Sequence, residues 1–179
     1  MITKLINPKT NYYKKAKEFI LSNNFPWFLE SEIVDGYSKE DKENYAIPSF
    51  WSHGVLIRPL DSHECSYPRV NSQYMPQLEV IFNEIFEYNN LPLKWMYRLN
   101  INLVQPHQGK QLTSPHCDHP WPHKNILIYL TDAGGETICE GESHNPAEDD
   151  IIIFSGYPER HHYKLPKEKN RVVIVGTYI

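Results

Sequence analysis

The chain has 179 residues and a formal net charge of −4 at pH 7. Hydrophobic residues make up 40% of it and aromatic residues 13%, which is enough apolar material for one folded domain with its own core and argues against a disordered chain. The mild negative charge disfavours nucleic acid as a partner, because binding to phosphates needs a basic surface.

The cysteines and the apolar runs set the expected location. Cys65, Cys117 and Cys139 are an odd number and show no Cys-x-x-Cys spacing, which argues against a disulfide scaffold and against a zinc ribbon. The first residues, Met1–Pro8, lack the apolar stretch of a secretory signal peptide. The longest aliphatic or aromatic run, Ile126–Leu130, is too short to span a bilayer. We therefore expect a protein of the reducing cytoplasm with no membrane partner.

The N-terminal half alternates helical and extended patterns. Apolar residues three and four apart predict an amphipathic helix at 10–22, and a broader stripe predicts a core-packed helix at 72–88. Phe25–Leu29 is predicted to be an aromatic edge strand, and Phe50–Ile57 a second strand. The polar and charged segment 35–46 is predicted to be a mobile loop, either a solvated connector or a lid over a site.

From residue 94 onward the apolar period changes from that of a helix to that of a strand. Closely spaced strands without helices between them predict an antiparallel sandwich or barrel within a single domain. Residues 1–93 would supply supporting helices and strands, and residues 94–179 the β core. The predicted strands lie at 95–104, 125–130, 135–140, 150–155, 161–165 and 171–178.

The segment Ser114–His119 carries the first candidate site residues, His116 and Asp118. On an extended backbone, residues two apart point to the same face, so this segment would present a nitrogen donor and an oxygen donor together. Two of the three ligands of a ferrous site with two histidines and one carboxylate would then come from one short segment. The alternative is a surface turn in which Asp118 caps His119.

The third ligand would come from a distant part of the chain, where His161 and His162 are the candidates. Neighbours on a strand face opposite sides, so only one of the two histidines can point inward. Arg171 opens the last apolar run, and its guanidinium could bind a carboxylate through two hydrogen bonds. The alternative for Arg171 is a surface ion pair with Glu168 or Asp149.

Other polar residues near these positions have simpler explanations. His53 stands beside aromatic residues and is expected to be a hydrogen-bonded packing residue rather than part of a cleft. His119 and His123 flank Trp121 between two prolines, where a stiff exposed loop is preferred over binding of substrate or a second metal. Cys117 is expected to point away from its two neighbours and to pack.

Several short motifs follow one another in a fixed order along the chain. They are Phe-Pro-Trp at 25–27, Arg98-x-Asn100-x-Asn102, Pro-His-x-Asp at 115–118, Ile-Leu-Ile-Tyr-Leu-Thr-Asp at 126–132, Gly-Glu-Thr at 135–137, and a late His-x-x-x-x-Pro followed by Arg171 and a β-branched run. Taken together, these motifs resemble those of the Fe(II)- and 2-oxoglutarate-dependent oxygenases, in particular the small prolyl-4-hydroxylase-like members common in phage genomes. The resemblance covers about residues 94–179.

This resemblance implies a mainly β fold, the double-stranded β-helix of the jelly-roll kind, here buttressed by N-terminal helices. It implies that His116, Asp118 and His161 ligate Fe(II) and that Arg171 binds the distal carboxylate of 2-oxoglutarate. His161 is preferred to His162 because its distance along the chain to Arg171 resembles the family spacing better.

One position departs from the family pattern. Many members have Ser or Thr two residues after the basic residue, whereas this chain has Val173. The second donor to the distal carboxylate would then come from another strand, with Tyr129, Thr137 and Asn102 as candidates of equal rank.

The resemblance implies an oxygenase that uses O2, Fe(II) and 2-oxoglutarate to hydroxylate an unactivated C–H bond. The substrate would be a peptidyl side chain such as proline, an amino acid or another small metabolite. One alternative is a cupin-type metalloprotein without 2-oxoglutarate, in which Arg171 would be dispensable. Another is a metal-free jelly-roll binding module whose histidines only recognise a ligand.

Overall fold

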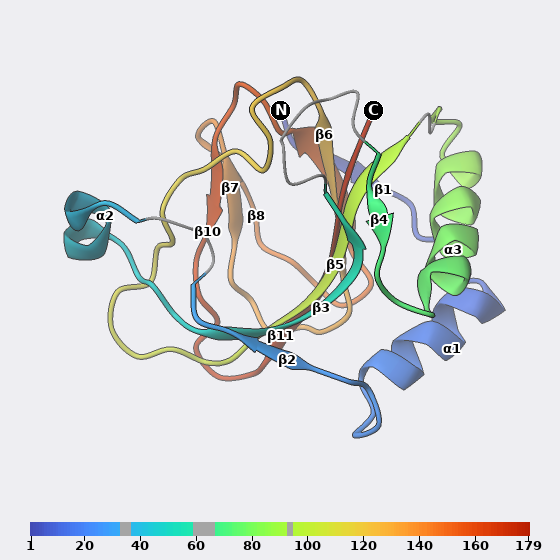
Figure 1. The fold of residues 1–179 in the computed structure, drawn as a ribbon, viewed down its shortest axis with the longest axis horizontal. Helices are drawn as coiled ribbons and strands as arrows, with labels where there is room; N and C mark the ends of the chain where they lie inside the picture. The colour runs from blue at the N-terminus through green and yellow to red at the C-terminus, as the bar shows by residue number, and fades with distance from the viewer. Residues whose placement is uncertain (33–36, 59–66, 93–94) are drawn as a thin grey trace.

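A computed structural model describes residues 1–32, 37–58, 67–92 and 95–179 and shows a mainly β protein (Figure 1). No helix within these ranges has the length and apolar character to cross a membrane. The elements are β1 (Thr3–Leu5), α1 (Asn11–Ile20), β2 (Phe28–Glu30), α2 (Lys39–Asn44), β3 (Phe50–Ile57), β4 (Arg69–Val70), α3 (Met75–Tyr88), β5 (Met96–Val104), β6 (Lys124–Tyr129), β7 (Thr137–Cys139), β8 (Glu142–His144), β9 (Ile151–Ser155), β10 (His161–Tyr163) and β11 (Arg171–Tyr178).

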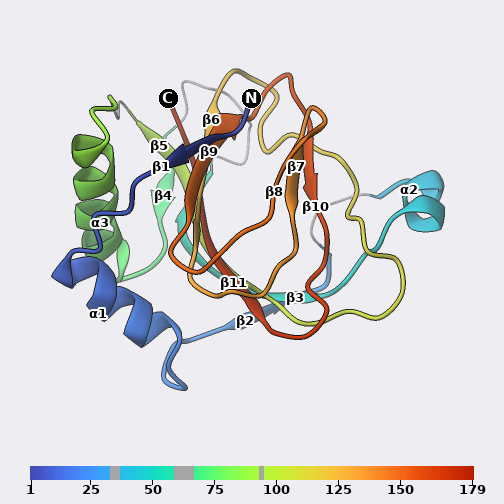
Figure 2. The ribbon, with the colours of Figure 1, turned by 180° about the vertical axis from the view of Figure 1, so that it is seen from behind.

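Two antiparallel sheets face each other, as the front and back views show (Figure 1 and Figure 2). The larger sheet has eight strands in the order β1-β9-β6-β11-β5-β3-β2, with β4 beside β3, and the smaller has the order β10-β7-β8. Strands distant in sequence are neighbours, because β11 lies between β5 and β6 and pairs with both. The predicted jelly-roll class is confirmed.

The outer face of the larger sheet packs against α1 and α3, which lie side by side in both views (Figure 1, Figure 2). α3 begins with a proline in its first turn, where the missing N–H costs no helical hydrogen bond. Its buried stripe at helical period meets apolar side chains from β5, β6 and β11. The two predicted N-terminal helices are therefore confirmed as supports of the sheet, each a few residues shorter than expected.

Polar contacts join α1 and the segment before it to the turn before β9. Asp149 accepts a hydrogen bond from Tyr13 Oη at 2.6 Å and forms ion pairs with Lys17 at 2.5 Å and Lys9 at 3.0 Å. Burial alone would raise the pKa of Asp149, but hydrogen bonds from these partners lower it to about 2. The carboxylate is thus held in its charged form by the fold.

Two expectations about the N-terminal half need correction. The segment predicted as a loop contains α2 at 39–44, because Ser38 and Asp41 form a capping box, each side chain accepting the other's backbone N–H at 3.1 Å. Residues 35 and 36 of that segment lie outside the described ranges, as does Cys65. The short strands β1 and β4 of this half had no sequence prediction, and neither did β8 in the C-terminal half, whereas β2 is an edge strand as expected.

Candidate metal centre and anion pocket

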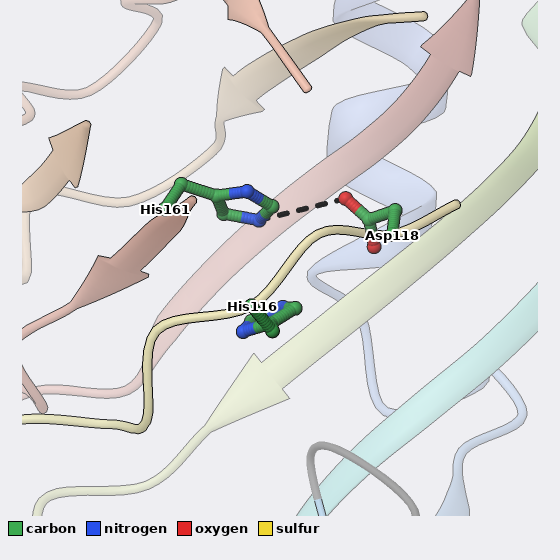
Figure 3. Close-up of side chains that lie close together, drawn as sticks. All are labelled: His116, Asp118 and His161. Carbon is green, nitrogen blue, oxygen red and sulfur yellow. Dashed lines mark ion pairs between the residues drawn. The ribbon is translucent and has the colours of Figure 1, made fainter. Parts of the chain in front are cut away.

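Three side chains from two distant segments converge between the sheets: His116, Asp118 and His161 (Figure 3). Their ligand atoms all lie within 4.8 Å of one another. His116 and His161 are paired in an antiparallel bridge, with backbone N–H to O distances of 3.0 and 2.9 Å, so their ring centroids are only 4.5 Å apart. Asp118 Oδ2 lies 3.5 Å from His161 Nε2. Within the described ranges, no second group of three potential metal ligands comes this close.

The protonation of this cluster suits a divalent transition metal. His116 Nδ1 lies 3.0 Å from the carbonyl of Ser114, so Nδ1–H donates there and Nε2 keeps its lone pair for a metal. Burial lowers the pKa of His161 to about 3, so its ring is neutral. Burial would raise the pKa of Asp118, but its electrostatic interactions with His161 and Arg98 hold it well below its usual range. Two imidazoles and one carboxylate form a donor set that fits Fe(II).

Two neighbours hold the carboxylate of Asp118 in place. Arg98 Nη1 donates to its Oδ1 at 2.7 Å, and Asn125 Nδ2 donates to its Oδ2 at 3.0 Å. The same amide nitrogen of Asn125 lies 3.4 Å from Nδ1 of His161, so one fully buried side chain contacts two of the three cluster residues. Sequence analysis missed Asn125. The available signal was an amide at the start of the apolar strand β6.

A cavity of about 500 Å³ opens onto this cluster from between the sheets. Its described lining includes all three cluster residues together with Arg171, Thr137 and Asn102. The predicted metal ligands and the predicted carboxylate-binding arginine therefore share one cavity.

Arg171 is only 3% exposed and forms no ion pair with a carboxylate of the described residues. Its Nη2 donates to Thr137 Oγ1 over a long 3.3 Å, and its Nε has no partner within the same ranges. A surface pair with Glu168 or Asp149 is thereby excluded, since Arg171 is buried and Asp149 pairs elsewhere. A buried cation without a counter-ion costs several kcal/mol, so this end of the cavity is suited to an anion.

Two of the three candidate second donors lie beside Arg171. Tyr129 Oη and Thr137 Oγ1 are 2.7 Å apart, and the ring of Tyr129 lies 5.2 Å from the Arg171 guanidinium carbon. Asn102 also lines the cavity, but its amide oxygen accepts from Ser52 Oγ at 3.0 Å and no described hydrogen bond joins it to Arg171. The geometry thus separates the candidates into a hydroxyl pair at the arginine and an amide further along β5.

Three other residues considered in the sequence are His162, Cys117 and His53. His162 lines the cavity but does not join the three-residue cluster. Cys117 is half-buried, with its thiol 3.4 Å from the carbonyl of Glu159, and it is among the residues that line the cavity. His53 is confirmed as a packing residue, because its ring nitrogens lie 2.8 Å from the Pro26 carbonyl and 2.8 Å from a serine hydroxyl.

The expected exposed loop around Trp121 is buried instead. His119 stacks on Trp121 with ring centroids 4.9 Å apart, and its Nε2 lies 2.7 Å from Thr177 Oγ1. His123 is 4% exposed and its Nδ1 donates to the Trp121 carbonyl at 2.8 Å. Three large rings bury more apolar area by packing together than a solvated loop would, which outweighs the turn signal of the two prolines.

Comparison with known proteins gives a likeness in fold only. No protein-family model matches the chain, and no curated protein matches it by sequence. It is similar to an oxidoreductase of the 2OG-Fe(II) oxygenase family from Burkholderia pseudomallei, with a TM-score of 0.68 and 16% identity over 99% of this chain and 84% of that one. It is also similar to SnoN, the non-heme alpha ketoglutarate dependent epimerase from nogalamycin biosynthesis, with a TM-score of 0.58 and 12% identity over 99% and 77%. The chain therefore has the double-stranded β-helix fold of structures in the 2OG-Fe(II) oxygenase family.

Proposed function

We propose that this protein is a 2-oxoglutarate-dependent non-haem iron oxygenase. The observation that supports this function is that one cavity contains both a cluster of two histidines and a carboxylate and a buried arginine that has no counter-ion among the described residues. A cupin-type metal site or a metal-free binding module would use the cluster at most. Neither explains a buried guanidinium in the same cavity that forms no ion pair with a carboxylate of the described residues, which is costly without an anionic ligand.

In this proposal His116, Asp118 and His161 hold Fe(II), and Arg171 with the Tyr129–Thr137 hydroxyl pair holds the distal carboxylate of 2-oxoglutarate. Bound iron and 2-oxoglutarate would supply the activation of O2 for attack on a substrate C–H bond.

The chain's own residues prepare this site. The hydrogen bond from His116 Nδ1–H to the Ser114 carbonyl fixes the orientation of the ring and leaves Nε2 as the nitrogen that would bind a metal. Arg98 and Asn125 fix the Asp118 carboxylate from two sides. Burial of Arg171 removes competing water, which strengthens its attraction for a carboxylate.

The proposed reaction is hydroxylation of a peptidyl side chain such as proline, an amino acid or another small metabolite. The polar positions Arg98, Asn100 and Asn102, all on β5 and all lining the cavity, would face that substrate. Product analysis by mass spectrometry separates hydroxylation, which adds one oxygen atom, from epimerisation, the activity in the name of SnoN, which adds none.

The test is titration of the Fe(II)-loaded protein with 2-oxoglutarate without air. We expect a weak visible charge-transfer band, and succinate once air is admitted. Arg171→Met should weaken 2-oxoglutarate binding about 100-fold or more, because it removes a desolvated charge pair, and should leave iron affinity within about 3-fold. Arg69→Met, at an exposed arginine of β4, is the matched control.

Three results would count against the proposal. Absence of both the band and succinate removes it. Equal loss of iron and 2-oxoglutarate binding in Arg171→Met, or no loss of either, favours the cupin-type alternative. Ligand binding that survives a strong chelator and the His116→Ala substitution favours the metal-free module.

A further inference from the structure

Tyr163, which sequence analysis did not single out, lies on the same strand as His161 and contacts Arg171. It lies two residues after His161 on β10, and residues two apart on a strand point to the same face. Across the smaller sheet, Tyr163 is paired with Thr137 and His161 with Cys139. One three-residue strand therefore carries a cluster histidine at its start and, at its end, a ring beside the hydroxyl that contacts Arg171.

The guanidinium of Arg171 contacts two tyrosine rings, one from each sheet. Its central carbon lies 4.6 Å from the ring centroid of Tyr163 on β10 and 5.2 Å from that of Tyr129 on β6. Both distances are within the range of about 6 Å for cation–π attraction, which is strongest where water is excluded. The Tyr163 contact is the shorter of the two, and it comes from the sheet that does not carry Arg171.

Neither ring supplies a negative charge. A tyrosine phenol is neutral at physiological pH, since its ordinary pKa is about 10. Burial raises the pKa of Tyr129 further. The rings reduce the cost of the buried guanidinium through their faces and leave its charge available to an anion.

Backbone hydrogen bonds and side-chain packing both fix the position of Tyr163. Its backbone N–H donates to Thr113 Oγ1 at 3.0 Å, and the N–H of Thr113 donates back to the Tyr163 carbonyl at 3.0 Å. The side chain packs against a small buried apolar cluster that includes Phe50 and Val104. A ring fixed in this way can restrict the orientation of a guanidinium whose hydrogen bond to Thr137 is long, at 3.3 Å.

We propose that Tyr163 is a positioning residue for 2-oxoglutarate. Its ring, rather than its hydroxyl, covers one face of the Arg171 guanidinium, so that the planar N–H edge is presented to the carboxylate. This inference depends on the proposed function.

The first experiment compares two substitutions at this position. Tyr163→Phe keeps the ring and should bind 2-oxoglutarate within about 3-fold of the wild type, whereas Tyr163→Leu should bind it about 10-fold more weakly. Dissociation constants are measured without air on the Fe(II)-loaded protein, and iron affinity is measured separately by chelator competition and should not change. Tyr88→Leu, at an exposed tyrosine ending α3, is the control.

A second series keeps the shape of the side chain and removes only the charge distribution of the ring. Phenylalanines with increasing fluorine substitution, introduced at position 163 by nonsense suppression, should weaken 2-oxoglutarate binding stepwise, because fluorine withdraws electron density from the ring face. This series remains informative if Tyr163→Leu disturbs β10 and with it His161.

The inference is overturned if Tyr163→Leu binds 2-oxoglutarate like the wild type, if Tyr163→Phe loses as much as Tyr163→Leu, or if fluorination has no effect. Any of these results leaves the proposed function intact as long as the wild type binds 2-oxoglutarate and Arg171→Met does not. If the wild type itself fails to bind 2-oxoglutarate, the proposed function and the inference both fall.

Discussion

The two faces of β5 carry different kinds of side chain. Toward the helices, Leu99 and Ile101 are fully buried among apolar side chains of α3 and of the larger sheet. Toward the cavity, the alternating positions Arg98, Asn100 and Asn102 are all polar and only partly buried. The apolar face stabilises the fold, while the polar face keeps hydrogen-bonding groups available to a ligand. The apolar core and the lining of the cavity are thus divided between alternate residues of one strand.

The largest expected effect tests this division at two adjacent residues. Leu99→Ala removes a fully buried side chain from the helix-side core and should lower the free energy of unfolding by about 2–5 kcal/mol. Asn100→Ala, on the cavity side, should lower it by less than about 1 kcal/mol. Urea unfolding monitored by circular dichroism measures both. Equal losses would show that the cavity face contributes to stability as much as the core does.

A smaller effect is expected at Asn125, which belongs neither to the apolar core nor to the cavity face of β5. Asn125→Leu keeps the volume of a buried side chain but removes the amide that contacts Asp118 and His161. Metal affinity should fall about 10- to 100-fold, as measured by chelator competition with Fe(II) or Co(II). The control is Asn83→Leu on the exposed face of α3. Unchanged affinity in Asn125→Leu would mean that Arg98 alone orients the carboxylate.

The smallest effect concerns acid stability on the helix side. The pKa of Asp149 is lowered to about 2 from an ordinary 3.8, so its contribution to stability is complete above about pH 4 and is lost as the pH falls through 2. On the order of 1–2 kcal/mol should disappear over this range in the wild type after allowance for solvent screening, and less in Asp149→Asn. Urea unfolding at pH 7 and pH 2.5 measures the difference. The same pH dependence in both proteins would contradict the assigned role of Asp149.

The strands of the C-terminal half could be predicted because they carry their own signal. Runs such as Ile151–Phe154 and Val172–Val175 are apolar and β-branched, and Gly or Pro residues bound them. β1 could not be predicted, since three residues show no period and are extended only through pairing with β9. α2 was missed although the Ser38–Asp41 capping box was present, because its charged composition was taken as a loop signal.

For the candidate site, the sequence allowed the prediction of residues whose spacing is local. His116 and Asp118 lie two positions apart, and His161 and Arg171 stand at recognisable distances after them. Their roles in binding stay predictions, although the structure brings all four to one cavity. Asn125 and Tyr163 could not be predicted, because their importance arises from side-chain contacts with Asp118, His161 and Arg171 that form only when the strands fold together.

The short length of β10 limits which insertions and deletions this protein can accept during evolution. Because its three residues alternate between faces, a shift of one position in its pairing with β7 would turn His161 and Tyr163 away from the cavity in a single step. An insertion or deletion in the preceding turn would then remove a histidine of the three-residue cluster and the ring beside Arg171 at the same time. Variation in loop length is therefore expected to be tolerated at the far ends of the larger sheet and selected against immediately before His161.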